Sequence, residues 1–399
     1  MSRSTALLRG LALCFAILLV PAIGNAETGN PKALKYHEAL LKRPTPGYLY
    51  DRFYNTWLDT DSLDTLKAFL SERVEQSNGT ADRLLLAFYY AKQGDDVKAL
   101  QQFRTALAND PGNAHAWYHK AIVEARTLDF ETAIVDLETA NKSKPDKKLA
   151  TLISKLQGKL YVRNRQTEKA MAIWKKLLDA NPKDEDLYED IIELQIAEGL
   201  FDEAIELSNT LINNTADKYK QVIRRVRTGD IQQRAGKRTQ ALEIYAATLA
   251  DVGHGTWLER EILAQIEELF RREDDLVGLK EEYEKLLAQY PKRIQVHKQF
   301  ARLLSEQGEI EQAQKQFENI LRLTPGNRAN TEAYVSLLAS NDKLPDAIKV
   351  MKALIEQNAD DTELQIRLAR LHHQAEDNTA AAAALLKFLK SSDKSEYAF

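Results

Sequence analysis

The chain has 399 residues, with 55 basic and 59 acidic side chains and a formal net charge of −4. Because these charges nearly cancel, no global surplus argues for binding to nucleic acid or to an anionic membrane surface. Its 16 glycines and 10 prolines exclude collagen-like and low-complexity classes, and a mean hydropathy of −0.44 excludes a polytopic membrane protein. What remains is a soluble, mostly helical protein.

Residues 1–26 have the features of a secretory signal peptide. Arg3 and Arg9 form a basic start, the apolar run 11–20 follows, and small residues precede the expected cleavage point. A membrane span needs ~20 apolar residues, which this run does not reach. The single cysteine, Cys14, lies inside the segment, so the mature chain has no thiol for a disulfide, a metal or a nucleophile. We therefore expect an exported, periplasmic or extracellular protein without a transmembrane span in its mature chain.

A pattern with a period of 34 residues follows a lead-in helix and turn predicted at 27–45. Each period has two stretches with apolar spacing of three and four, separated by a polar or glycine turn, so it predicts a helical hairpin. The predicted repeats are 46–79 (degenerate), 80–113, 114–147, 151–184, 185–218, 222–255, 260–293, 294–327, 328–361 and 362–395. Residues 396–399 begin a further, incomplete repeat.

Particular positions of the repeat carry residues of one kind. Position 20 is small, which allows two helices to cross closely: Ala99, Ala133, Ala170, Ala204, Ala241, Ala313, Ala347 and Ala381. Position 24 is bulky and fills the space beside it: Phe69, Phe103, Leu137, Trp174, Tyr245, Tyr283, Phe317, Met351 and Leu385. Position 32 is a proline, which cannot continue the preceding helix: Pro111, Pro145, Pro182, Pro291 and Pro325. The turn glycines expected to end first helices are Gly94, Gly199, Gly236 and Gly308.

The period, the small residue at position 20, the aromatic at position 24 and the proline at position 32 together resemble the tetratricopeptide repeat (TPR) family. This resemblance implies an all-α, right-handed superhelical solenoid of about ten helical hairpins. It also implies that the first helices of the hairpins line a concave groove, which binds peptides or protein segments. Position 8, usually small in the family, is glycine or alanine in several repeats, including Gly158 and Gly229.

Three interruptions break the regular spacing, at 148–150, 219–221 and 256–259. Each precedes a first helix whose apolar pattern runs back through it. Because 3.6 residues make one turn, these first helices are predicted to be longer by about one turn.

The array stops at Phe399 with an apolar last helix that contains Leu385, Leu386 and Leu389. Solenoids normally have a polar capping face at each end. The pattern favours a chain that is the leading portion of a longer protein. The alternative is an edge that docks on a partner or self-associates with a second copy.

The motif search predicts no catalytic residue, no cofactor and no metal site. Neither a phosphate-binding glycine loop nor a nucleophile elbow nor a zinc or calcium motif occurs in the sequence. His115 and His119 have ligand spacing, but no third ligand has a reason to converge on them. The sequence therefore predicts a protein that is not an enzyme.

Charge and apolar character vary along the groove positions of the first helices. A basic stripe is predicted at Arg126, Lys155, Lys159 and Arg163, followed by an acidic band at Asp186, Glu189 and Glu193. The groove mouth is predicted to be apolar at Leu84, Phe88, Tyr118 and Ile122. The alternative for the charge bands is that they attract one another and fix the order of stacked hairpins, at ~1 kcal/mol or less for each exposed pair.

These observations predict a scaffold or adaptor that binds a protein or peptide segment in its groove, within an assembly associated with the cell envelope. One alternative is a regulatory or substrate-recognition arm of a longer enzyme whose catalytic domain lies beyond residue 399. Another is a binder of an anionic cell-wall polymer through the basic stripe. Binding that weakens steeply with salt would favour the polymer.

Overall fold

The computed structural model describes residues 30–358, 361 and 363–391. Within these residues the chain forms 21 helices and no strand, which confirms the all-helical prediction. The chain divides into two compact units, an N-terminal unit that ends at Ala180 and a C-terminal unit that begins at Asn181. The predicted signal peptide and residues 396–399 lie outside the described residues.

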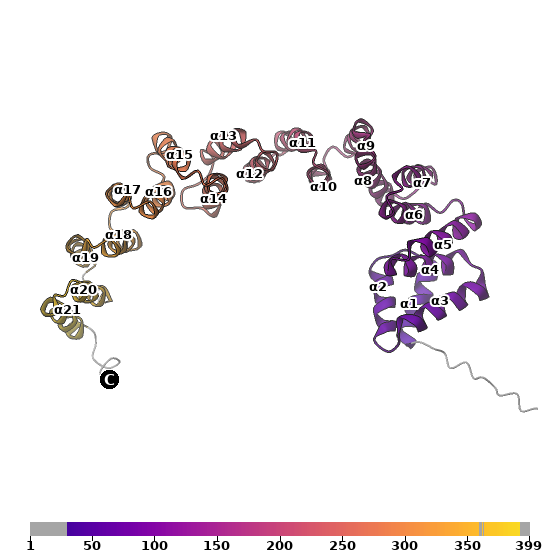
Figure 1. Cartoon of the computed structure of the whole chain (residues 1–399), viewed down its shortest axis with the longest axis horizontal. Helices are drawn as coiled ribbons and strands as arrows, with labels where there is room; N and C mark the ends of the chain where they lie inside the picture. Colours follow the sequence, from indigo (N-terminus) through magenta and orange to yellow (C-terminus); the bar gives the residue numbers. More distant parts are fainter. Residues whose placement is uncertain (1–29, 359–360, 362, 392–399) are drawn as a thin grey trace, which may run out of the picture. The chain divides into compact units, whose positions relative to one another are not determined.

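The N-terminal unit contains nine of these helices, labelled in Figure 1: α1 (Pro31–Lys42), α2 (Tyr48–Leu58), α3 (Leu63–Ser77), α4 (Thr80–Gln93), α5 (Asp96–Asn109), α6 (Ala114–Arg126), α7 (Phe130–Lys142), α8 (Lys147–Arg163) and α9 (Thr167–Asp179). The C-terminal unit contains α10 (Glu185–Ala197), α11 (Phe201–Asn214), α12 (Lys218–Arg234), α13 (Arg238–Leu249), α14 (Trp257–Arg271), α15 (Leu276–Gln289), α16 (Ile294–Glu306), α17 (Ile310–Leu323), α18 (Arg328–Ser340), α19 (Leu344–Gln357), α20 (Glu363–Gln374) and α21 (Asn378–Ser391).

Consecutive helices pack as pairs within each unit. The pairs α4 with α5, α6 with α7 and α12 with α13 make extensive contact, as do α16 with α17 and α20 with α21 (Figure 1). Each first helix of a pair ends where the sequence predicted a turn. Gly94, Gly199, Gly236 and Gly308 all have φ between +74° and +78°, a left-handed conformation that glycine adopts without steric cost.

The start of the array differs from a simple hairpin. Helix α2 packs more extensively on α1 than on α3, and α1 also contacts α4. An aromatic cluster holds these helices together, because Tyr50, Phe53 and Trp57 of α2 are all buried. The lead-in helix is therefore an integral part of the N-terminal core, a role that the sequence pattern did not reveal.

Small residues let bulky ones approach the opposite helix closely. The position-20 alanines from Ala99 to Ala347 are fully buried. At position 8, a Cβ placed on Gly158 would lie 2.2 Å from Nε1 of Trp174, and one placed on Gly229 would lie 2.4 Å from Cε1 of Tyr245. These separations are far below van der Waals contact, so each glycine makes room for the aromatic side chain of its own hairpin.

Two of the three interruptions lengthen first helices by about one turn, as predicted. Residues 148–150 and 219–221 lie inside α8 and α12, which have 17 residues each, whereas α6 and α10 have 13. Helix α14, which includes residues 257–259, has 15 residues. The extra residues therefore extend the N-terminal turns of these helices.

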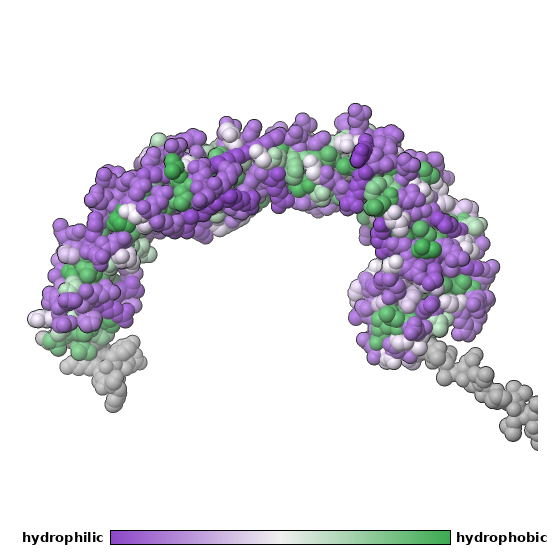
Figure 2. Space-filling model, in the orientation of Figure 1, coloured by the Kyte–Doolittle hydropathy of each residue, from purple (hydrophilic) through white to green (hydrophobic). Residues whose placement is uncertain are grey.

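The surface of the described residues is mainly hydrophilic, with separate hydrophobic patches (Figure 2). One patch lies on α21, where Leu385, Leu386 and Leu389 are exposed. Leu385 occupies position 24, which is buried in most other repeats, for example at Phe103 and Tyr283.

Candidate functional site

A cavity of about 290 Å³ lies in the N-terminal unit, on first helices α4 and α6 and on α2. Its walls also include Phe103 of α5 and the turn between α1 and α2. The lining residues are Pro46, Gly47, Tyr50, Asp51, Phe88, Ala91, Lys92, Phe103, His119, Ile122, Val123 and Arg126. This cavity is called the N-terminal cavity below.

The floor of the N-terminal cavity is aromatic. The ring of Phe88 makes edge-to-face contacts with three other rings. Its centroid lies 5.9 Å from that of Tyr50, 5.6 Å from that of Phe103 and 5.3 Å from that of His119. Such contacts fix the rings in place. The side chain of Ile122 is only half-buried, so an apolar ligand group can contact it.

His119 is a neutral member of this floor. Burial lowers its pKa to about 3, and the neighbouring His115 acts in the same direction. The imidazole therefore carries no charge at ordinary pH and contributes a polar edge to an apolar wall. The described residues contain no group of three or more His, Cys, Asp or Glu side chains that could hold a metal ion.

The charged groups at the rim are already engaged. Lys92 pairs with Oδ1 of Asp51 at 2.7 Å, and its Nζ lies 4.7 Å from the centre of the Tyr54 ring. Arg126 donates from Nη1 to the backbone oxygen of Ala91 at 2.8 Å and forms an ion pair with Asp96. The rim is therefore held by internal contacts, and its net charge is small.

Three of the predicted groove residues meet at this cavity, namely Phe88, Ile122 and Arg126. Leu84 does not, because it is fully buried in the core and was wrongly predicted to lie at the groove mouth. Tyr118 is half-buried, 5.0 Å from the His119 ring between centroids, and is not among the lining residues. Periodicity along one helix does not show which of its apolar side chains are buried in the core and which line a cavity.

The predicted basic stripe is divided between two helices, because Arg126 lies on α6 and its other three residues lie on α8. Lys155 and Lys159 are half-buried and Arg163 is exposed, all on α8. Each of the three has a partner within the structure. The backbone oxygen of Lys155 also accepts a hydrogen bond from Nε1 of Trp174 at 3.4 Å.

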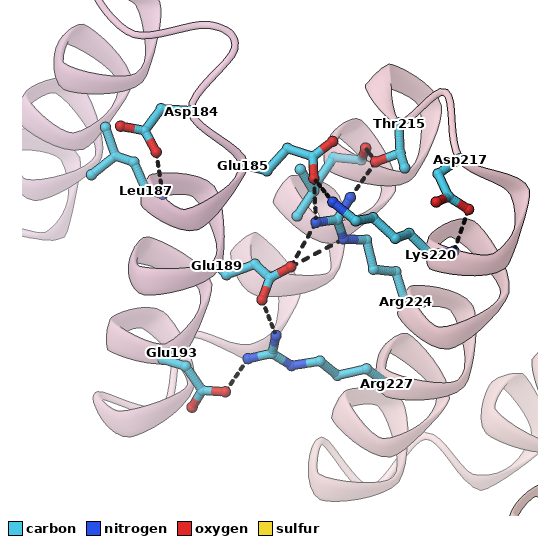
Figure 3. A network of polar contacts seen from close by, with 11 residues as sticks. Asp184, Glu185, Leu187, Glu189, Glu193, Thr215, Asp217, Lys220, Arg224 and Arg227 are labelled. Atoms are coloured by element: carbon cyan, nitrogen blue, oxygen red, sulfur yellow. Dashed lines mark hydrogen bonds and ion pairs between the residues drawn. The ribbon is translucent and has the colours of Figure 1, made fainter.

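The acidic band on α10 faces arginines of α12 (Figure 3). Glu189 accepts hydrogen bonds from Nε of Arg224 at 3.1 Å and from its Nη2 at 2.7 Å, and it also accepts one from Arg227 at 3.3 Å. Glu193 accepts a hydrogen bond from Arg227. The carboxylates and the guanidinium groups thus join the first helices of two successive repeats within the C-terminal unit.

The same network includes Glu185, which accepts hydrogen bonds from Lys220 at 2.9 Å and from Arg224 at 3.1 Å (Figure 3). These two hydrogen bonds hold the pKa of Glu185 below its usual value. Arg224 is nearly buried and also donates to the Thr215 hydroxyl. Asp186 lies outside the network and is exposed. The acidic band therefore includes two residues, Glu189 and Glu193, that link repeats.

No helix in the described part of the chain combines the length and the apolar character needed to cross a membrane. Fold and cavity together define an all-helical repeat protein with a pocket lined mainly by first helices and with internally paired charges at its rim.

A sequence model of the tetratricopeptide repeat family matches residues 84–145 and 335–396. Each matched segment begins inside a first helix and includes the second helix that packs on it. Together with the helix pairs and the period of 34 residues, these matches identify the family. The chain is a tetratricopeptide repeat protein.

Several solved structures are similar in fold. YrrB, described as a TPR protein with an unusual peptide-binding site, is 16% identical, covers 45% of this chain and 91% of its own, and has a TM-score of 0.33. A tetratricopeptide repeat protein from Parabacteroides merdae is 17% identical, with coverages of 64% and 93% and a TM-score of 0.38. PilF of Pseudomonas aeruginosa is 15% identical, with coverages of 58% and 99% and a TM-score of 0.35. No curated protein sequence matches the chain.

Proposed function

We propose that this protein is an exported scaffold that binds a protein or peptide segment through the N-terminal cavity and has no catalytic activity of its own. The observation that carries the proposal is the aromatic floor formed by Phe88 and its neighbours on the first helices α4 and α6. Tetratricopeptide repeats generally mediate protein interactions, which supports the proposal.

The chemistry of the cavity favours an apolar anchor side chain on the bound segment. Its floor is apolar, and the rim charges of Lys92 and Arg126 are matched by Asp51 and Asp96. Burial of an anchor would provide most of the binding free energy, at ~25 cal/mol for each Å² of apolar surface. Because the rim charges are paired internally, affinity should depend little on salt.

The test is a selection of short random peptides on the purified chain, followed by measurement of the dissociation constant (Kd) of an enriched peptide. The variant Ile122→Asp places an unpaired carboxylate in the cavity wall and is expected to raise Kd by about tenfold or more. The control is Val97→Asp on α5, where the side chain is 81% exposed and lies outside the cavity.

Both variants must first show the wild-type circular dichroism spectrum. Peptides that bind both variants equally well would contradict the assignment of the N-terminal cavity. So would a Kd that rises steeply between about 0.05 and 0.5 M salt, because that dependence indicates a binding site dominated by charge.

The second candidate function is binding of an anionic polymer along α8. The observation that favours it is the row of Lys155, Lys159 and Arg163 on one helix face. Poly-L-glutamate is a suitable probe. The double variant Lys155→Ala with Lys159→Ala should abolish salt-sensitive binding of this probe if the stripe is a binding site, and leave it unchanged if the stripe only stabilises the fold.

Export is part of the proposal and depends on the composition of residues 1–26. Expression of the full chain should yield a mature protein that begins at Glu27 and is recovered outside the cytoplasm. Mass spectrometry of the purified N-terminus checks this, and a chain that retains residues 1–26 in the cytoplasmic fraction would contradict it.

A further inference from the structure

A second and larger cavity, of about 560 Å³, lies in the C-terminal unit. It is formed by the first turns of α12 and α14 and by the connection between α13 and α14. The lining residues are Lys218, Tyr219, Gln221, Val222, Arg225, Asp251, Val252, Gly253, Thr256, Trp257 and Leu258. This cavity is called the connection cavity below, and its volume is typical of sites that enclose a ligand.

The residues that break the 34-residue spacing build much of this cavity. Tyr219 and Gln221 belong to the interruption at 219–221, and Thr256, Trp257 and Leu258 belong to that at 256–259. The regular helices of the repeat therefore support the cavity, and the added residues line much of it. The connection cavity lies at helix ends of the C-terminal unit and shares no lining residue with the N-terminal cavity.

Two aromatic side chains that line the cavity are largely exposed to solvent. Tyr219 is 55% exposed and Trp257 is 52% exposed, whereas Val222, Val252 and Leu258 form a buried floor. Within the described part of the chain, neither the Tyr219 hydroxyl nor the Trp257 indole N–H has a hydrogen-bond partner. Exposed Trp and Tyr side chains whose N–H or O–H group has no hydrogen-bond partner are typical of the residues that anchor a bound peptide.

The wall that carries Trp257 is rigid. Glu259 is completely buried, accepts a hydrogen bond from the Gly255 amide at 2.5 Å and pairs with Arg293 at 3.0 Å. Arg293 also donates to the backbone oxygen of Leu249 at the end of α13. The connection is thus fixed at both ends before any ligand binds, which lowers the entropic cost of binding.

The charge of the connection cavity is positive. Arg225 and Asp251 neutralise each other through an ion pair of 2.7 Å. Lys218 is exposed and has no ion-pair partner among the described residues. It also occupies the first turn of α12, where a cation is unfavourable to the helix dipole. Lys218 therefore adds an uncompensated positive charge beside two exposed aromatic rings.

We propose that the connection cavity is a second binding site, which takes a peptide segment with an aromatic or large aliphatic side chain flanked by Asp or Glu. The anchor side chain contacts Tyr219 and Trp257, and the flanking carboxylate pairs with Lys218. This site goes beyond the function proposed for the N-terminal cavity and is independent of it.

The test uses short synthetic peptides in which anchor and flank vary separately. The central residue is Phe, Leu or Ser, and the flanks are Asp and Glu, uncharged, or Lys and Arg. On the full mature chain, Phe with acidic flanks should bind best, and both the Ser anchor and the basic flanks should weaken binding by about tenfold. Equal binding of acidic and basic flanks would overturn the proposal.

Variants then assign the binding to this cavity. Trp257→Ser should weaken binding of the acidic Phe peptide by about tenfold. Lys218→Glu should reverse the preference, so that basic flanks bind better than acidic ones. The matched control is Val277→Ser on α15, where a 69% exposed side chain lies outside the cavity. Binding that Trp257→Ser and Lys218→Glu leave unchanged would refute the site, since both positions are exposed and need not alter the fold.

Two further measurements separate this proposal from others. Cellohexaose is an uncharged oligosaccharide that aromatic side chains can also bind; tighter binding of cellohexaose than of the peptides, lost in Trp257→Ser, would overturn the peptide proposal. The variant Ile122→Asp in the N-terminal cavity should leave binding of the acidic Phe peptide unchanged. If Ile122→Asp abolishes it, the two cavities are not independent and the proposal fails.

Discussion

At the residue scale, a glycine on one helix leaves room for an aromatic side chain from the helix that is paired with it. Tyr245 is fully buried, and its ring lies where a side chain at position 229 would otherwise begin. Its hydroxyl donates a hydrogen bond to Oδ1 of Asp230 at 2.6 Å, which fixes the ring in this place. The close approach of α12 and α13 therefore depends on the missing Cβ of Gly229.

We predict that Gly229→Ala lowers the free energy of unfolding by about 1–3 kcal/mol. Alanine favours a helix over glycine by ~1 kcal/mol. The added Cβ would lie only 2.4 Å from Cε1 of Tyr245, however, so the ring or the helix must move and the clash outweighs the gain. Urea unfolding followed by circular dichroism measures the change.

A double-mutant cycle is the control for this contact. In the background Tyr245→Ala, the substitution Gly229→Ala no longer meets a ring and should stabilise the chain by about 0.5–1 kcal/mol through helix propensity alone. Destabilisation of the same size in both backgrounds would show that the Tyr245 ring is not the cause.

The sequence predicted which residues occupy these positions, but not that Gly229 and Tyr245 contact each other. Alignment of the repeats assigned Gly229 to position 8 and Tyr245 to position 24, each explained by its own size. Which small residue faces which large one depends on the crossing of two helices, a quantity that spacing along one helix does not contain.

At the scale of an element pair, α6 and α7 enclose an ion triad. Nζ of Lys120 lies 2.5 Å from Oε1 of Glu124 and also pairs with Asp136, and all three side chains are buried. Two carboxylates share one ammonium group, so the triad carries an excess negative charge when both are ionised. Burial, and then the neighbouring Asp136, raise the pKa of Glu124 to about 7.

This shift predicts that the triad weakens the fold as pH rises. In the folded chain Glu124 keeps its proton up to about pH 7, whereas its ordinary pKa is 4.5. The folded state therefore binds more protons between these values, and stability falls from about pH 4.5 to about pH 7. Glu124→Gln removes the titration, so its stability relative to wild type should increase by about 2 kcal/mol between pH 5 and pH 8.

Unfolding by urea at both pH values measures this difference. The contributions of other titrating groups cancel, because wild type and Glu124→Gln both contain those groups. Glu131→Gln, at an exposed position of α7, is the control and should show no such change. A constant difference between wild type and Glu124→Gln across this range would contradict the shift.

Periodicity was more successful for elements than for sites. It predicted the helix pairs, the turn glycines and the extra residues at the start of α8 and α12. It missed the packing of α1 on α4, because a single amphipathic helix does not specify its neighbour. It also missed the connection cavity. The interruptions at 219–221 and 256–259 were visible, but the cavity forms only where the starts of α12 and α14 and the α13–α14 connection meet in space.

At the scale of the whole molecule, stability should be local, because each repeat contacts mainly its neighbours. The charge bands illustrate this. Arg224 joins Glu185 and Glu189 of the preceding repeat from a nearly buried position, and Lys220 pairs with Glu185 from an exposed one. The first contact should stabilise the C-terminal unit, and the second should contribute little.

We predict that Arg224→Met lowers the free energy of unfolding of the C-terminal unit by about 1–3 kcal/mol, whereas Lys220→Met changes it by less than about 0.5 kcal/mol. Hydrogen exchange followed by mass spectrometry should show faster exchange in α10–α12 of Arg224→Met and unchanged exchange in α4–α7. Faster exchange throughout both units would mean that the array unfolds as one cooperative body.

The added residues at 219–221 and 256–259 have a consequence for protein engineering. They add cavity-lining residues at the starts of α12 and α14, while the interior alanines and aromatics keep their places in the repeat. Transplanting both segments into successive junctions of another helical array should therefore create a cavity there without redesign of its interior.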